Sequence, residues 1–208
     1  EIVRFLVESG ADVNKAMKDG TTPLFLAVLN GHMQVVCFLV EADVDVNQAT
    51  LDGTTPLSVA AQNGHMKVVR FLVEAGGDIN KAKNNGAHPL GMAALNGHME
   101  VVGFLVESGA DINKANDNGA TALFAAAQSG QIEIVRFLVK AGADMNKAES
   151  GADVNKAMKD GTTPLFLAVL NGHMQVVCFL VEADVDVNQA TLDGTTPLSV
   201  AATERGGK

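Results

Sequence analysis

Hydrophobic and polar positions recur along this chain with the period of short amphipathic helices. Leu24, Ala27 and Val28 are spaced three and four residues apart, which places them on one face of a helix. A broader apolar stripe follows at 35–40. The Asn30-Gly31 dipeptide between the two is typical of a helix end, because glycine accepts a left-handed backbone there. The pattern predicts a helix, a tight turn and a second helix.

The same unit then repeats. An Asp-Gly or Asn-Gly turn dipeptide begins each copy, and from Asp19 to Asn118 the step is 33 residues each time. Thr22 can cap the first helix, and Pro23 suits its first position, where a missing N–H does no harm. One helix pair cannot bury the apolar stripe of its second helix, so neighbouring units must stack. The sequence therefore predicts an all-α repeat solenoid of stacked helix pairs, joined by β-turn or hairpin loops.

A single array accounts for residues 1–202, and the chain reads as a piece of a longer protein because it begins at Glu1 without a targeting pattern. The polar residues at 203–208 are expected to form a frayed tail. The predicted boundaries are a half repeat at 1–18, full repeats at 19–51, 52–84, 85–117 and 118–148, an oversized loop at 149–159, a repeat at 160–192 and a partial repeat at 193–202.

One repeat boundary is irregular. Residues 8–61 and 149–202 are identical over 54 positions, at an offset of 141 residues, which is not a multiple of 33. The excess is visible as two copies of one link, GADMNKA at 142–148 and GADVNKA at 151–157. A recent duplication and an assembly error both explain the identity. We expect continuous stacking across this seam, with a protruding, mobile loop around 148–155.

Charge and cysteine usage narrow the class of partner and the compartment. The net charge of −9 argues against a nucleic-acid partner, since binding a phosphate backbone needs clustered Lys and Arg. No apolar run approaches the roughly 18 residues of a membrane span, so we expect no membrane insertion. Cys37 and Cys178 occupy one position of two distant repeats, which argues against a disulfide. We expect an intracellular protein of the cytoplasm, with the nucleus left open.

Known catalytic and ligand-binding patterns do not occur in the sequence. There is no phosphate loop, no G-x-S-x-G, no H-E-x-x-H and no C-x-x-C. The run 43–47 resembles the opening of a calcium loop, but the Gly and Glu that such a loop requires are replaced by Gln48 and Thr54. Link aspartates such as Asp78 are expected to tie their turns through side-chain to backbone hydrogen bonds. We predict no enzyme, no cofactor and no metal.

Histidines stand at one position of several repeats, where His32, His65, His98 and His173 each follow an Asn-Gly turn. A ladder of imidazoles could bind metal, but one ring per repeat gives no convergent site. We therefore favour a bond from each ring to the backbone of its own inter-helix turn. His88 replaces the threonine of a helix start and is expected to be a local variation of the cap.

Phenylalanines follow the same period and predict packing between repeats. Six of the nine share one position of the second helix, and three share one position of the first. Arg70 and Arg136 align with the two cysteines, so that position is expected to be exposed.

The motifs inside each unit carry a family resemblance. Residues 52–84 contain a turn, Thr-Pro-Leu, Gly-His, Val-Val and a Gly-Asp-hydrophobic-Asn link, in that order. This stretch resembles the ankyrin repeat, and the likeness covers nearly the whole chain. The resemblance implies a non-enzymatic, monomeric scaffold that binds another protein through the concave side of the array. A structural spacer segment of a longer repeat protein, with no dedicated partner, is the alternative.

The resemblance also implies which residues meet the partner, at the hairpin tips and on the exposed side of the first helices. Exposed leucines on a polar ridge suggest an apolar contact with that partner. The tip residues are Lys18, Asp19, Thr21, Leu51, Asp52, Thr54, Asn84, Asn85, Ala87, Asp117, Asn118, Lys159 and Asp160, and the helix residues are Leu29, Gln62, Leu95, Gln128 and Leu170.

Overall fold

The computed structural model describes residues 1–141 and 153–203, and these two ranges contain α-helices and no strand. This confirms the all-α repeat fold. The helices are α1 (Ile2–Glu8), α2 (Pro23–Leu29), α3 (Met33–Glu41), α4 (Pro56–Gln62), α5 (Met66–Glu74), α6 (Pro89–Leu95), α7 (Met99–Glu107), α8 (Ala122–Gln128), α9 (Ile132–Lys140), α10 (Pro164–Leu170), α11 (Met174–Glu182) and α12 (Pro197–Thr203).

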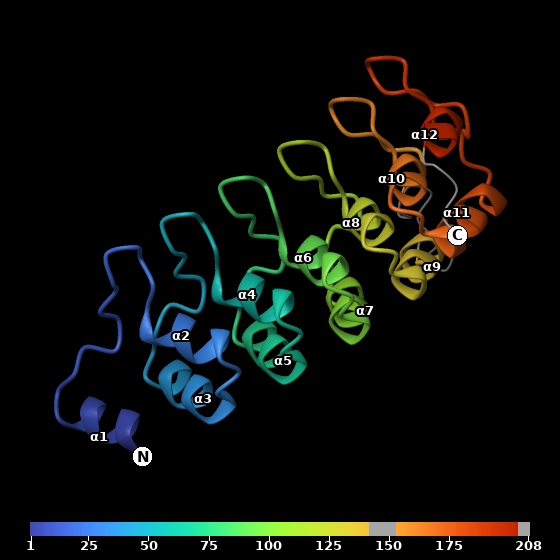
Figure 1. Ribbon diagram of the computed structural model, residues 1–208. Helices are drawn as coiled ribbons and strands as arrows, with labels where there is room; N and C mark the ends of the chain where they lie inside the picture. The colour runs from blue at the N-terminus through green and yellow to red at the C-terminus, as the bar shows by residue number, and fades with distance from the viewer. Residues whose placement is uncertain (142–152, 204–208) are drawn as a thin grey trace.

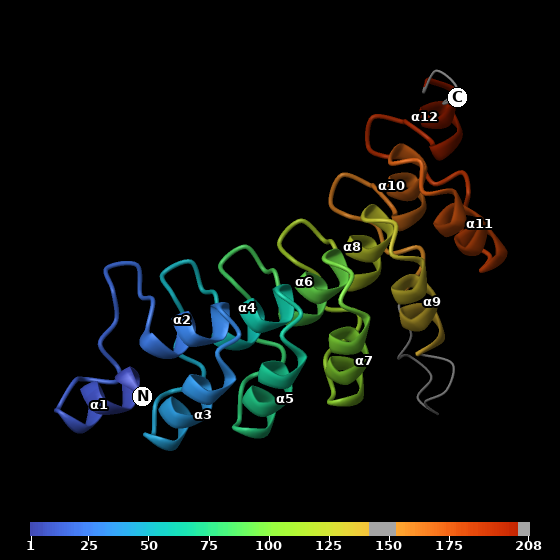
Figure 2. The same cartoon turned by 60° about the horizontal axis from the view of Figure 1, so that its bottom comes forward.

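The helices form two rows along an elongated array. Figure 1 shows the first helix of each repeat (α2, α4, α6, α8, α10, α12) next to the projecting hairpins, with the second helices in the other row. Each first helix packs against the first helices of its neighbours and against the second helix of its own repeat. Figure 2 shows the same two rows from a turned view. The first and last helices, α1 and α12, lie at opposite ends of the array, as expected for a solenoid.

Local chemistry defines the ends of the first helices as predicted. The Phe25 backbone N–H donates to Thr22 Oγ1 over 3.1 Å, so this threonine caps α2. After α2 the backbone turns through Gly31, whose φ of 66° is the left-handed conformation that favours glycine. Asp43 also adopts a left-handed φ, of 61°, in place of the glycine of other links.

The core lies between the two rows and runs the length of the array. Leu24 and Val28 of α2 are buried, as the periodicity predicts, and Leu39 of α3 is buried with them. Fully buried alanines such as Ala60 and Ala93 lie on successive first helices, where a short side chain lets the backbones approach closely. Each fully buried leucine contributes about 1.5–3 kcal/mol before conformational entropy is subtracted.

The phenylalanines of the second helices pack at the core boundary rather than inside it. Phe38, Phe104 and Phe179 are half-buried, and each has an arginine of the preceding repeat over its ring. The Arg70 guanidinium carbon lies 4.6 Å from the centre of the Phe104 ring. The predicted exposure of the arginine position is confirmed, and its use is a cation–π contact that links neighbouring second helices.

Stacking continues across the seam. α10 packs on α8, and α11 packs on α9, as in the regular repeats. The Asp153 N–H donates to Asn113 Oδ1 over 3.0 Å, and Lys156 Nζ donates to the Asn113 carbonyl over 2.9 Å. The second copy of the duplicated link therefore takes the place of an ordinary link. The loop expected around 148–155 falls mostly on residues 142–152, outside the described part of the chain.

Candidate functional site

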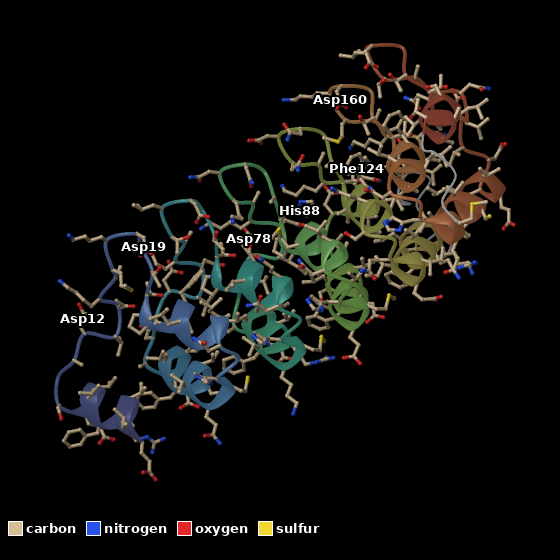
Figure 3. The ribbon with its side chains drawn as sticks, in the orientation of Figure 1. Asp12, Asp19, Asp78, His88, Phe124 and Asp160 are labelled. Carbon is tan, nitrogen blue, oxygen red and sulfur yellow. The ribbon has the colours of Figure 1, made fainter. Side chains whose placement is uncertain are left out.

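The hairpin tips are joined to one another by backbone hydrogen bonds. Leu51 N–H donates to the Asp19 carbonyl over 2.8 Å, and Asn84 N–H donates to the Asp52 carbonyl over 2.9 Å. The same kind of bond joins every later pair of neighbouring tips. At the seam, the Lys159 N–H donates to the Asn118 carbonyl over 2.9 Å. Figure 3 labels Asp19 and Asp160, which lie on hairpins of distant repeats along the same edge of the array. The tips thus form one continuous ridge of fixed register.

Side-chain carboxylates or amides shape the tips from within, as Asp52 does in the second repeat and Asn85 in the third. The Thr50 hydroxyl donates to Asp52 Oδ1 over 2.5 Å, the Thr54 hydroxyl donates to Asp52 Oδ1 over 2.8 Å, and Lys83 Nζ lies 3.1 Å from Oδ2. These bonds, the one from Thr50 above all, hold the pKa of Asp52 well below its usual range. The pKa of Asp19 is lowered in the same way by its bonds from Thr21.

Most of the residues predicted from the resemblance are exposed on one face. Among the tip residues, Ala87 is half-buried, whereas Thr21 and Thr54 are buried because they turn inward to bond their aspartates. These two threonines hold the tip in shape and present little surface. The exposed tip residues are Lys18, Asp19, Leu51, Asp52, Asn84, Asn85, Asp117, Asn118, Lys159 and Asp160.

The first helices add apolar surface beside the ridge. Leu29, Leu95 and Leu170 are 40%, 38% and 43% exposed, and Leu51 at a tip is 74% exposed. Gln128 is exposed at the equivalent position, and Gln62 is half-buried. Leu192, which is 83% exposed, was not among the predicted residues, although the 54-residue identity makes it the copy of Leu51. We call the exposed tips and these first-helix residues the tip-and-first-helix face.

Histidines fix the ends of the first helices that carry this face. His65 Nε2 lies 3.2 Å from the Leu29 carbonyl oxygen, His98 Nε2 2.9 Å from that of Gln62, and His173 Nε2 3.0 Å from that of Gln128. The prediction that each ring bonds within its own turn is wrong, because these three rings meet carbonyls of the preceding repeat. Each imidazole thereby ties two repeats together behind the exposed side chains.

A pocket opens in this face between the third and fourth repeats. It has a volume of about 240 Å³ and is lined by residues of α6, α8 and their hairpins, among them Asn85, Leu95 and Gln128 of the predicted set. His88 and Phe124 also line it, and Figure 3 shows both on the side of the array that carries the hairpins.

His88 departs from the role expected of it. It stands at the N-cap of α6, but its side chain makes no capping hydrogen bond, so the prediction of a local cap variant is wrong. The ring is 2% exposed, and neither nitrogen has a hydrogen-bond partner among the described residues. Burial lowers the pKa of the imidazole below its usual value, which leaves the ring neutral at physiological pH.

A family model described as ankyrin repeats, in three copies, matches residues 1–83, 44–116, 75–149 and 147–207. Together these matches cover almost the entire chain. The chain belongs to the ankyrin-repeat family. No curated protein matches it. Ankyrin repeats are generally protein–protein interaction modules, and proteins built from them are typically non-enzymatic scaffolds.

The links between these ankyrin repeats are structural. The aspartate of each link accepts from the N–H two residues later, as Asp78 does from Asn80 over 2.9 Å, which confirms the predicted turn bond. The asparagine reaches the next repeat: Asn80 Oδ1 accepts from the Asp111 N–H over 3.0 Å. In the described ranges no group of three or more His, Cys, Asp or Glu could hold a metal ion, and no helix there is long and apolar enough to cross a membrane.

Proposed function

We propose that this ankyrin-repeat array is a non-enzymatic scaffold that binds another protein through its tip-and-first-helix face. The observation that carries the proposal is the set of exposed leucines on an otherwise polar ridge. Leu29, Leu95 and Leu170 occupy one position of the first helices in the first, third and fifth repeats, and Leu51 lies at a tip; the four keep 38–74% of their surface in water. A row of exposed apolar side chains rimmed by polar ones is typical of a protein-binding surface.

Rigidity supports the same proposal. The tips are joined by backbone bonds, and the first-helix ends are held from behind by the histidines. A partner that docks on this face meets a surface whose spacing is already set, so little conformational entropy is lost on binding. The exposed polar tips, such as Asp52 and Asn85, supply hydrogen-bonding groups around the leucines.

The test compares two double variants of the chain in binding to a protein captured from the cells of origin. Leu29→Arg with Leu95→Arg places two charges on the face and should weaken the captured complex at least ~10-fold, as expected for loss of buried apolar anchors. Arg70→Glu with Arg136→Glu changes the second-helix surface and should leave the affinity unchanged. Thermal melts of both variants check that the array is intact.

Loss of binding in the Arg70 and Arg136 variant alone would place the interface on the second helices and overturn the proposal. A chain that captures no saturable partner would instead support the alternative, a structural spacer within a longer repeat protein.

A further inference from the structure

The third repeat differs from the others at two positions that face each other. Where the other first helices begin with a threonine, this repeat has His88, and three residues later it has Gly91 in place of a serine or phenylalanine. In the second repeat the corresponding Thr55 and Ser58 hydroxyls lie 2.9 Å apart and are buried. A Cβ atom added to Gly91 would lie 3.2 Å from His88 Cε1, so the glycine makes room for the imidazole ring, which packs directly against it.

His88 and Gly91 together form part of the wall of the pocket of about 240 Å³ in the tip-and-first-helix face. Its apolar lining includes Met92 and Leu95 from α6 and the Phe124 ring from α8. An apolar cavity of about 150 Å³ is enough to hold benzene, so this pocket has room for a substituted aromatic ring. A thioether and an aromatic ring in the lining favour an aromatic occupant through sulfur–aromatic and ring–ring contacts.

The polar side chains that line the pocket indicate which polar group the aromatic occupant carries. No charged side chain lines it, and its polar members are Asn85, Asn116, Thr121, Gln128 and the imidazole of His88. A charged occupant would therefore lose its hydration without gaining an ionic partner. The buried imidazole has one donor and one acceptor nitrogen, both without a hydrogen-bond partner among the described residues. A hydroxyl group, which can donate or accept, is complementary to it.

We propose that this pocket receives a tyrosine side chain of the partner protein, with its ring against Met92 and Phe124 and its hydroxyl hydrogen-bonded to His88. The proposal rests on the proposed function, since it names the residue type that this face recognises. The ring nitrogens are buried, so the hydroxyl reaches them only when the lining rearranges. The lining includes Met92, an unbranched side chain of the kind that adapts its shape to an occupant. None of the 208 residues is a tyrosine, so these residues do not themselves supply the occupant.

The experiment uses p-cresol, the side chain of tyrosine, as the probe and needs no partner. The chain has neither Trp nor Tyr, so fluorescence excited in the phenol band reports p-cresol alone. NMR signals of the His88 and Phe124 rings locate the binding. We expect saturable binding of p-cresol that shifts both rings, and binding of toluene that is at least ~10-fold weaker, which corresponds to about 1.4 kcal/mol for the hydroxyl.

Two variants taken from the chain's own repeats serve as controls. His88→Thr removes the imidazole without filling the pocket, so p-cresol should lose its advantage and bind no more tightly than toluene. His88→Thr with Gly91→Ser recreates the buried pair of the second repeat, should remain folded, and should bind neither probe.

Equal binding of p-cresol and toluene to the unaltered chain would show that His88 does not recognise a hydroxyl and would overturn the proposal. Tighter binding of 3-methylindole than of p-cresol would assign the pocket to tryptophan, and no shift of either ring would remove the site. None of these outcomes affects the leucine variants that test protein binding as such, so the two proposals can fail separately.

Discussion

His98 Nε2 lies 2.9 Å from the carbonyl oxygen of Gln62, a contact that crosses from the third repeat to the last turn of α4 in the second. Gln62 lies on the tip-and-first-helix face, so this bond connects the order of the face to the stacking of the array. Without the His98 ring, the Gln62 carbonyl would lose this hydrogen bond, and the last carbonyls of a helix have no partner within the helix itself.

Removal of this imidazole should lower stability measurably. His98→Ala loses one inter-repeat hydrogen bond and its packing, and we expect a loss of about 1–2 kcal/mol in the free energy of unfolding, measured by urea denaturation. His32→Ala is the matched control, because the ring of His32 is exposed and makes no hydrogen bond in the described part of the chain. Equal losses in the two variants would refute the inter-repeat role.

The glycine that faces this histidine has two separate constraints. Gly64 has a φ of 69°, and a Cβ atom there would lie 2.5 Å from His98 Nδ1. Gly76 has a φ of 87°, but a Cβ atom there would meet nothing within 4 Å. Gly76→Ala should therefore show only the backbone penalty of about 1 kcal/mol, and Gly64→Ala should be destabilised by more. Thermal melts that rank the two variants equally would contradict the contact between Gly64 and His98.

The buried His88 predicts a stability that depends on pH. Burial lowers the pKa of the folded imidazole below the value of 6.5 that holds when the chain is unfolded, so below that pH the unfolded chain binds a proton that the folded chain does not. The contribution of the neutral His88 ring to the free energy of unfolding is therefore complete above pH 6.5. It decreases as the pH drops towards the pKa of the folded state. The Gly86 backbone raises the pKa of the ring, as does Asp111, and Lys114 lowers it, each with a smaller effect than burial. The contact with Gly86 falls outside hydrogen-bond geometry, so the ring nitrogens keep no hydrogen-bond partner among the described residues.

Urea denaturation at a series of pH values measures this effect. The slope contributed by His88 is positive between the two pKa values and at most about 1.4 kcal/mol per pH unit. His88→Thr should remove that part of the slope, whereas His32→Ala should retain it. An identical pH dependence in His88→Thr and the unaltered chain would show that the ring is accessible to protons when folded.

The duplicated link predicts that the seam can be shortened. Because Asp153 and Lys156 of the second copy make the ordinary link bonds to Asn113, the nine residues at 142–150 are not needed to reach the next repeat. Their deletion restores the spacing of the regular repeats and should raise the melting temperature slightly, since the loop-closure gain is well under ~1 kcal/mol. A lower melting temperature would mean that these residues support the stack.

The period of 33 residues was enough to predict the fold, because each unit must bury its apolar stripe against the next. The set of tip and first-helix residues came from the resemblance to the ankyrin repeat, carried over position by position, and most of that set is exposed. The period could not show which carbonyl lies nearest to a histidine ring, so the inter-repeat bonds of His65 and His98 were missed. Nor could it show that Thr54 turns inward to Asp52.

The pocket at His88 depends on two substitutions in one repeat and on the spacing of α6 and α8. Both substitutions, His88 and Gly91, are visible in the sequence. A histidine at the start of a helix is, however, most simply interpreted as a helix cap. Only the packing of the fourth repeat against the third shows the ring buried without a hydrogen bond among the described residues.

Site-specific photo-crosslinking tests the central claim, that partner binding uses the tip-and-first-helix face, most directly. A photoreactive phenylalanine analogue is placed singly at Leu51 or Leu95 on this face, and at Arg70 or Arg136 on the second helices, and each chain is irradiated with the captured partner. We predict crosslinks to the partner from Leu51 and Leu95 that unlabelled chain competes away, and none from the two arginine positions. Crosslinks from Arg70 and Arg136 with none from Leu51 and Leu95 would contradict the account.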